Sequence, residues 1–179
     1  MAKEISNIIE FTLIYNRYKV YLFNYVKRMV NNITAAEDII QIVFLKFFEN
    51  MENIRDRDKC EFWLFKTARN EVFNYYRSKK IKASYFENAD TEDITAADEE
   101  GTELLFDQKE MHSIIMKELN SFPQEQREAY LLKEYSGLSY REIAGLMNIE
   151  EDLVKSRLFK IRRKLADKVS RILFYGVKS

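Results

Sequence analysis

Hydrophobic and polar residues follow a helical period near the end of the chain, from Ser139 to Leu165. Ser139 is followed three residues later by Glu142, which is the spacing of a capping box and predicts the start of a helix there. Asn148 is expected to end this short helix. The residues that it should carry inward are Ile143, Leu146 and Met147.

A second helical pattern begins beyond Ile149. Its apolar residues recur at steps of four, three and four, which at about 100° per residue places them on one narrow stripe: Val154, Leu158, Ile161 and Leu165. The opposite face is basic and rich in hydrogen-bonding groups: Asp152, Lys155, Ser156, Phe159, Lys160 and Arg163, with Arg157, Arg162 and Lys164 on the flanks. The two patterns together predict a helix-turn-helix whose second helix enters a DNA major groove. A solvated amphipathic helix is the alternative, and the cap, the turn spacing and the basic flanks favour DNA.

Turn-forming residues are scarce along the whole chain. Four glycines and one proline in 179 residues are too few for hairpins or barrels, so the sequence predicts an all-α fold. With 46% hydrophobic residues, the helices have enough apolar surface for packed cores. No run of 18 apolar residues and no signal-peptide layout is present, so we expect a cytoplasmic protein without membrane insertion.

The composition gives little support for a metal site or a catalytic site. A single cysteine, Cys60, excludes an internal disulfide, and the only histidine, His112, makes no zinc site with it. There is no nucleophile and base pair, no metal cluster and no phosphate-binding glycine loop. We therefore expect no enzyme, no cofactor, no metal and no small-molecule substrate.

The formal charge of zero conceals three blocks of alternating sign. Residues 1–86 hold 15 basic and 10 acidic side chains, a net charge of +5. Residues 87–110 hold 1 basic and 10 acidic side chains, a net charge of −9. Residues 111–179 hold 13 basic and 9 acidic side chains, a net charge of +4. Two basic modules on either side of an acidic flexible linker indicate polyanion binding by the ends.

The N-terminal module begins with two predicted helices. The first covers about residues 6–30, and a capping box of Thr34 and Glu37 is expected to open the second, which reaches about Met51. The core stripe of the second helix is Ile40, Val43, Phe44 and Phe47. Ile42 and Leu45 project on the other side, among Asp38 and Gln41. Either this helix is buried all round in a bundle, or it has a face that docks another protein; the pattern alone favours neither.

After a polar loop at 53–59, a third helix is expected from about Glu61 to Lys80. Its inward residues are Leu64, Ala68, Val72 and Tyr75. Aromatic, amide and cationic side chains share the other face: Trp63, Lys66, Asn70, Phe73, Asn74 and Arg77. Rings that stack on bases, amides that bind base edges and cations that bind phosphates are typical of proteins that hold single-stranded nucleic acid. A protein-binding surface or a buried Trp63 is the alternative.

Two more helices are expected between the linker and the helix-turn-helix. The first runs from about Gln108 to Leu119. The next should start with Pro123 at its first position and end at Gly137. With the helix-turn-helix, they make a four-helix C-terminal module.

Two blocks of this sequence resemble the extracytoplasmic-function (ECF) group of bacterial sigma-70 factors, which direct RNA polymerase to promoters. Residues 35–54 (AAEDIIQIVFLKFFENMENI) and 62–80 (FWLFKTARNEVFNYYRSKK) are similar to sigma region 2. Residues 122–165, which include the helix-turn-helix, are similar to region 4. The blocks cover about half of the chain in the family's order. The resemblance implies region 2 at 1–84, a linker at 85–107 and region 4 at 108–179.

The resemblance also implies a role for each face. Docking on the clamp coiled coil of the polymerase largest subunit would fall to Asp38, Gln41, Ile42 and Leu45. Recognition and melting of the minus-10 element would fall to Trp63, Lys66, Asn70, Asn74, Arg77 and Lys80, helped by the loop at 53–59. Minus-35 recognition would fall to Arg141, Lys155, Ser156, Arg157, Phe159, Lys160, Arg162 and Arg163. The implied partners are core RNA polymerase, promoter DNA and an anti-sigma factor.

Two positions depart from the family pattern. Ile42 stands where an acidic residue is usual after Gln41, and residues 150–153 (EEDL) replace a common Pro-x-Gly-Thr. Carboxylates suit a helix N-terminus but repel phosphates, so we expect minus-35 contacts to start later in the helix or to favour cytosine amines. A stand-alone helix-turn-helix regulator that binds duplex DNA is the alternative function.

Overall fold

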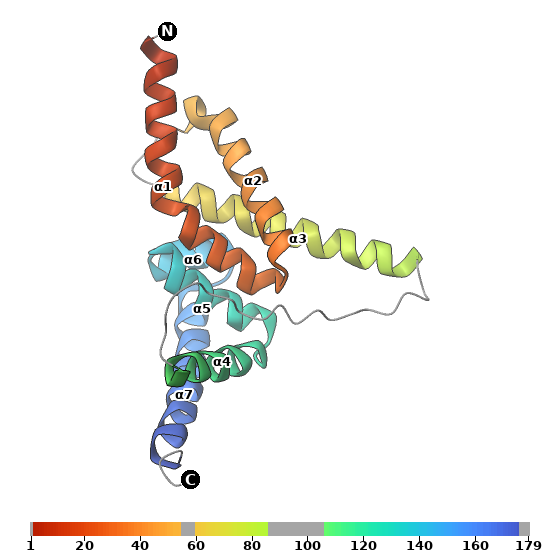
Figure 1. The fold of residues 1–179 in the computed structure, drawn as a ribbon, viewed down its shortest axis with the longest axis vertical. Helices are drawn as coiled ribbons and strands as arrows, with labels where there is room; N and C mark the ends of the chain where they lie inside the picture. The colour runs from red at the N-terminus through yellow and green to blue at the C-terminus, as the bar shows by residue number, and fades with distance from the viewer. Residues whose placement is uncertain (1, 55–59, 86–105, 176–179) are drawn as a thin grey trace. The chain divides into compact units, whose positions relative to one another are not determined.

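The protein consists of helices throughout the described part of the chain, which comprises residues 2–54, 60–85 and 106–175 of this computed structural model. The described residues form seven α-helices and one short 3₁₀ helix and contain no strand, so the all-α prediction is confirmed (Figure 1). The elements are α1 (Ala2–Val30), α2 (Ile33–Asn50), η1 (Met51–Asn53), α3 (Cys60–Tyr85), α4 (Phe106–Asn120), α5 (Gln124–Ser136), α6 (Tyr140–Met147) and α7 (Glu151–Tyr175). They form two compact units, one built on α1 to α3 and one built chiefly on α4 to α7.

The N-terminal unit is a bundle in which α1, α2 and α3 all contact one another. Its core holds large side chains from each helix: Leu22, Tyr25, Val26 and Met29 from α1, Val43, Phe44 and Phe47 from α2, and Leu64, Phe65, Ala68 and Val72 from α3. The rings of Tyr25 and Phe65 meet edge to face with centroids 5.5 Å apart. The predicted inward stripes of α2 and α3 are therefore buried, except that Tyr75 is only half-buried.

Helix α2 begins differently from the prediction. Asn31 adopts a left-handed conformation with φ of 51° and ends α1. Asn32 is then extended, and its side chain accepts a hydrogen bond of 2.8 Å from the amide of Ala35, which makes it the N-cap. The predicted capping box of Thr34 and Glu37 is wrong because α2 has already begun at Ile33, and both residues lie inside it.

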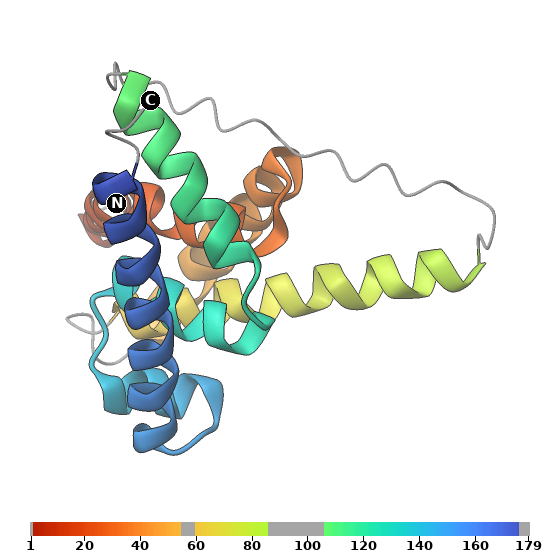
Figure 2. The ribbon, with the colours of Figure 1, turned by 90° about the horizontal axis from the view of Figure 1, so that it is seen from below.

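Helix α3 starts at Cys60 and continues to Tyr85, five residues beyond the predicted end at Lys80. Its second half extends away from α1 and α2 (Figure 2). The first residue of the expected polar loop, Asn53, is the last residue of η1, while residues 55–59 and most of the predicted linker lie outside the described residues. The segment of α3 that carries the expected nucleic-acid face is thus a continuous helix from Trp63 to Lys80.

The C-terminal unit has its own core, in which α7 contacts both α4 and α6. It is made of Leu119, Ala129, Leu131, Leu132, Ile143, Leu146, Val154, Leu158 and Ile161. Helix α5 begins at Gln124, one residue after the predicted start, since the carbonyl of Pro123 accepts hydrogen bonds from the amides of Gln126 and Arg127. Gly137 follows the helix with φ of 70°, a conformation that favours glycine, as expected of a helix end.

No helix within the described ranges is both long and apolar enough to span a membrane. The same residues contain no cluster of histidine, cysteine and carboxylate side chains that would hold a metal ion.

Candidate functional site

The helix-turn-helix is formed by α6 and α7, as the sequence predicts. Ser139 and Glu142 make the full capping box: the serine hydroxyl accepts from the amide of Glu142 at 3.2 Å, and the amide of Ser139 donates to the Glu142 carboxylate at 2.8 Å. Asn148 closes α6 in a left-handed conformation with φ of 56°. The two predicted apolar stripes are buried between the helices and their neighbours. The capping box and the two buried stripes therefore fix the position of α7 relative to α6.

The outward face of α7 carries most of the residues expected to contact DNA. Lys155, Phe159, Lys160, Arg162 and Arg163 are exposed, and the ring of Phe159 keeps 65% of its surface accessible. Ser156 is half-buried and Arg157 is largely covered, and both lie at the edge of this face. Arg141 is exposed on α6.

Lys155 is not a free cation. Its ammonium lies 3.0 Å from the carboxylate of Glu151 and 3.2 Å from that of Asp152, both in the first turn of α7. Hydrogen bonds to Glu151 and then to Asp152 raise the pKa of Lys155 above its ordinary value. Its charge is thus already countered at the helix end that first meets base edges in this motif.

Three other basic residues on the flanks of α7 are tied to neighbouring helices. Arg157 pairs with Glu125 of α5 at 2.6 Å, and Arg162 lies 3.5 Å from Glu134. A hydrogen bond to Tyr140, with a further contribution from Glu134, raises the pKa of Arg162. Lys164 contacts Glu118 of α4 at 2.9 Å.

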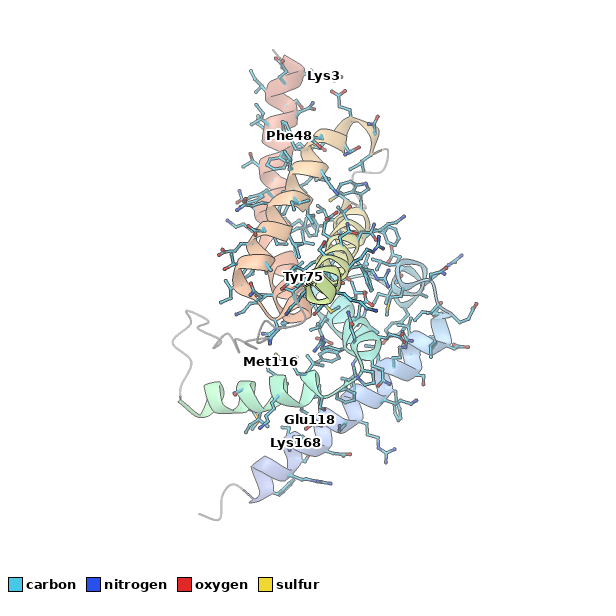
Figure 3. The ribbon with its side chains drawn as sticks, turned by 90° about the vertical axis from the view of Figure 1, so that its right-hand side faces the viewer. Lys3, Phe48, Tyr75, Met116, Glu118 and Lys168 are labelled. Carbon is cyan, nitrogen blue, oxygen red and sulfur yellow. The ribbon has the colours of Figure 1, made fainter. Side chains whose placement is uncertain are left out.

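Glu118 holds a second lysine of α7 as well, since Lys168 lies 3.8 Å from its carboxylate; Figure 3 labels both residues. The pKa of Glu118 is lowered, chiefly by its hydrogen bond with Lys164. Within the described residues, Lys160 and Arg163 have no such ion-pair partner. The unpaired positive charge of these two residues therefore lies about two and a half to just over three turns into the helix, which begins at Glu151.

The second candidate face lies on α3. Lys66, Asn70, Phe73, Asn74, Arg77 and Lys80 are exposed along it, as predicted. Trp63 departs from this pattern, because it is half-buried with its ring centroid 5.7 Å from that of Phe47. The helical wheel placed Trp63 on the free face, but the neighbouring α2 partly covers it. Phe73 is the more accessible ring, and the Arg69 guanidinium lies 4.6 Å from its centroid.

The third candidate face is the outer side of α2. Asp38 and Gln41 are exposed, and Ile42 and Leu45 keep 40% and 59% of their surface accessible. The alternative of a helix buried all round is therefore wrong. Phe48, one turn further on and labelled in Figure 3, is also exposed and extends the same apolar face; counting in steps of three and four from Leu45 would have found it.

A groove of about 390 Å³ adjoins this face between α1 and α2. It is lined by Tyr15, Lys19, Val20, Phe23, Glu37, Ile40 and Gln41.

Comparison with known proteins finds matches to two family models, one in each half of the chain. Residues 14–81 match the family model described as sigma-70 region 2, and residues 112–165 match the model described as sigma-70, region 4. The chain is 28% identical over 158 residues to RNA polymerase sigma factor SigZ of Bacillus subtilis, which covers 85% of this chain and 82% of that protein. It is 27% identical over 169 residues to the ECF RNA polymerase sigma-E factor of Escherichia coli K12, and the match covers 91% of this chain and 88% of that protein.

Two solved structures share the fold. One is the sigma factor RpoE in complex with the anti-sigma factor NepR from Bartonella quintana, with a TM-score of 0.68 at 20% identity over 94% of this chain and 97% of that one. The other is CnrH in complex with the cytosolic domain of CnrY, with a TM-score of 0.58 at 18% identity over 89% of this chain and 87% of that one.

Proposed function

Because the chain belongs to the sigma-70 family of RNA polymerase sigma factors, in its ECF group, we propose that its two units divide promoter recognition between them. Residues 1–84 bind core polymerase and open the minus-10 element, residues 108–179 recognise the minus-35 element, and residues 85–107 link them. The observation that carries this proposal is the pairing of two surfaces in one chain: an exposed apolar face on α2 in the matched region 2 and a helix-turn-helix in the matched region 4.

Core polymerase binds to the outer face of α2. Ile42 and Leu45 are exposed apolar side chains next to the exposed Asp38 and Gln41, and an apolar patch with a polar rim is the usual composition of a protein interface. The partner surface is the clamp coiled coil of the largest polymerase subunit. Ile42, in place of the family's usual acidic residue, makes this contact more apolar.

The exposed face of α3 holds the melted minus-10 strand. Phe73 offers a ring for stacking, Asn70 and Asn74 offer amides for base edges, and Arg77 and Lys80 offer cations for phosphates. Unstacking a base costs a few kcal/mol, which stacking and phosphate contacts offset. Trp63 and Lys66 continue the face toward the start of α3.

Helix α7 lies in the major groove of the minus-35 element. Lys160 and Arg163, together with the exposed ring of Phe159, form the centre of the contact. Lys155 and Ser156 lie nearer the helix start, and Arg141 and Arg162 lie toward the phosphates on either side. Arg157, which pairs with Glu125, holds α7 against α5 and makes no phosphate contact. Since Glu151 and Asp152 already hold Lys155, the first turn of α7 contributes less affinity for phosphate than its sequence suggests.

The chain contributes binding and strand separation, and the polymerase supplies all catalysis. The site of action is the cytoplasm, where core polymerase and promoter DNA are found. Both solved neighbours are bound to a second protein, which in one case is described as an anti-sigma factor. We propose that an anti-sigma factor likewise holds this chain in the absence of its inducing signal.

Transcription in vitro tests the proposal directly. Core polymerase with the purified chain should initiate on selected promoters, beginning with the region upstream of the chain's own gene, while core alone should not. Failure of the folded chain to bind core would overturn the proposal. Tight sequence-specific duplex binding without core would instead support the stand-alone regulator.

A further inference from the structure

The carboxylate of Glu71 on α3 contacts one side chain of α2 and one of α3 itself. The ammonium of Lys46 on α2 lies 2.6 Å from one oxygen of Glu71, and the amide nitrogen of Asn74 lies 3.4 Å from the other. The Glu71 side chain is only 12% exposed, whereas Lys46 and Asn74 are exposed. Glu71 is thus a largely buried link between a lysine of one helix and an asparagine on the candidate nucleic-acid face.

The chemistry of this link orients the Asn74 amide. An ionised carboxylate accepts hydrogen bonds and donates none, so Asn74 must turn its NH₂ group toward Glu71. The carbonyl oxygen of Asn74 then lies on the other side of the amide, free to accept a hydrogen bond from a ligand. Lys46 donates only, and by holding one Glu71 oxygen it keeps the second one aimed at Asn74.

The surroundings of Asn74 suit an unpaired base. Phe73 is exposed next to it, with Arg69 stacked on its ring, and Arg77 follows one turn later on the same face. A base that stacks here would present its Watson–Crick edge to the amide of Asn74.

We propose that Glu71 is a positioning residue that fixes Asn74 as a hydrogen-bond acceptor, so that the unpaired base bound there carries an exocyclic amine rather than a carbonyl. Adenine has an amine and no carbonyl, and it fits best. Thymine fits least, because its single ring N–H lies between two carbonyl oxygens that repel the Asn74 oxygen. This specificity rests on the proposed function of α3 in holding the melted minus-10 strand.

The test uses the full chain bound to core polymerase and a pool of single-stranded oligodeoxynucleotides with six randomised positions. Core binding is measured first, by co-migration on native gels, and its absence would overturn the proposed function itself. With core bound, selection should reveal one position at which adenine exceeds thymine by about five- to tenfold, the value of one hydrogen bond to a base. Replacing that adenine with purine, which lacks the amine, should lose the same factor without any change to the protein.

Two variants separate positioning from simple contact. In Glu71→Gln, Lys46 retains the side-chain oxygen, so the new NH₂ faces Asn74 and turns its amide around; the preference should invert toward thymine. Asn74→Ala should remove discrimination at that position alone. A merely structural role for Glu71 would lower affinity for all bases equally.

The chain offers a matched control in Glu52, which contacts Lys3 at 2.9 Å and Asn7 at 3.4 Å on the N-terminal part of α1. Glu52→Gln changes the same kind of lysine, glutamate and asparagine group and should leave base preference unchanged. The proposal is overturned if no position discriminates adenine from thymine, if purine binds as well as adenine, or if Glu71→Gln keeps the adenine preference. Should Glu71→Gln fail to fold, the purine comparison still decides.

Discussion

Arg157 of α7 and Glu125 of α5 form an ion pair of 2.6 Å in which the arginine side chain is only 13% exposed and the glutamate is 74% exposed. The guanidinium therefore lies against the protein and acts as a brace between the two helices. Arg163 of the same helix is exposed and lacks an ion-pair partner among the described residues. Two arginines that look alike in the sequence thus differ in exposure and in ion pairing.

Arg157→Met is expected to lower the free energy of unfolding by about 1 kcal/mol, because it removes the ion pair and the packing of a largely covered side chain. The salt dependence of minus-35 duplex binding by the holoenzyme should stay unchanged. Urea unfolding of the chain and binding isotherms at several salt concentrations measure the two effects. A shallower salt slope would place Arg157 on a phosphate after all.

Arg163→Met should produce the opposite result. Stability stays within about 0.5 kcal/mol, as is usual for an exposed substitution. The slope of log K against log salt becomes less steep by about 0.9, the value for one lost phosphate contact on duplex DNA. An unchanged slope would remove Arg163 from the interface.

Replacing Glu151 with Gln and Asp152 with Asn should strengthen minus-35 binding. The change removes two carboxylates near the phosphates and releases Lys155, so the salt slope should steepen by about 1. The cost is stability, about 0.5 to 1 kcal/mol, because acidic residues in the first turn interact favourably with the helix dipole. Equal affinity for the double variant and the wild type would mean that α7 meets DNA only beyond this turn.

Charge reversal of Lys155 and Lys160 to glutamate should weaken minus-35 binding at least tenfold, since two repulsive charges replace two attractive ones at the groove. Core binding should be unaffected, as measured by competition against a labelled wild-type chain. Loss of core binding instead would show that the outward face of α7 has been misassigned.

Ile42→Glu combined with Leu45→Glu should weaken core binding by about tenfold or more, because two apolar side chains at a protein interface are replaced by charges that resist desolvation. Leu13→Glu is the matched control: Leu13 is 66% exposed on α1, outside the proposed face. Circular dichroism verifies the fold. A folded double variant that competes for core as well as wild type would contradict docking through α2.

Two predicted capping boxes show what the sequence could and could not predict about helix starts. Ser139 and Glu142 gave the start of α6 correctly, because a capping box is a local interaction over three residues. Thr34 and Glu37 have the same spacing but lie within α2, since Asn32 captures the amide of Ala35 first. Where two local signals compete, the spacing alone does not identify which one caps the helix.

Trp63 and Glu71 show the other limit. A helical wheel treats one helix at a time, so it placed Trp63 on a free face and gave Glu71 no role. Phe47 partly covers Trp63, and Lys46 holds Glu71, and both partners come from α2. A contact between side chains on two different helices leaves no signal in the hydrophobic periodicity of either helix.

The sequence by itself determined the helical class, the buried stripes, the helix-turn-helix and the resemblance to sigma regions 2 and 4, because caps and apolar periodicity act within a few residues. Tertiary structure alone decided which charges on those helices are available. It pairs Arg157, Arg162 and Lys164 with carboxylates on other helices and leaves Lys160 and Arg163 exposed without such a pair in the described residues. Ion pairing depends on the distance between side chains in space, and that distance is set only when the helices pack.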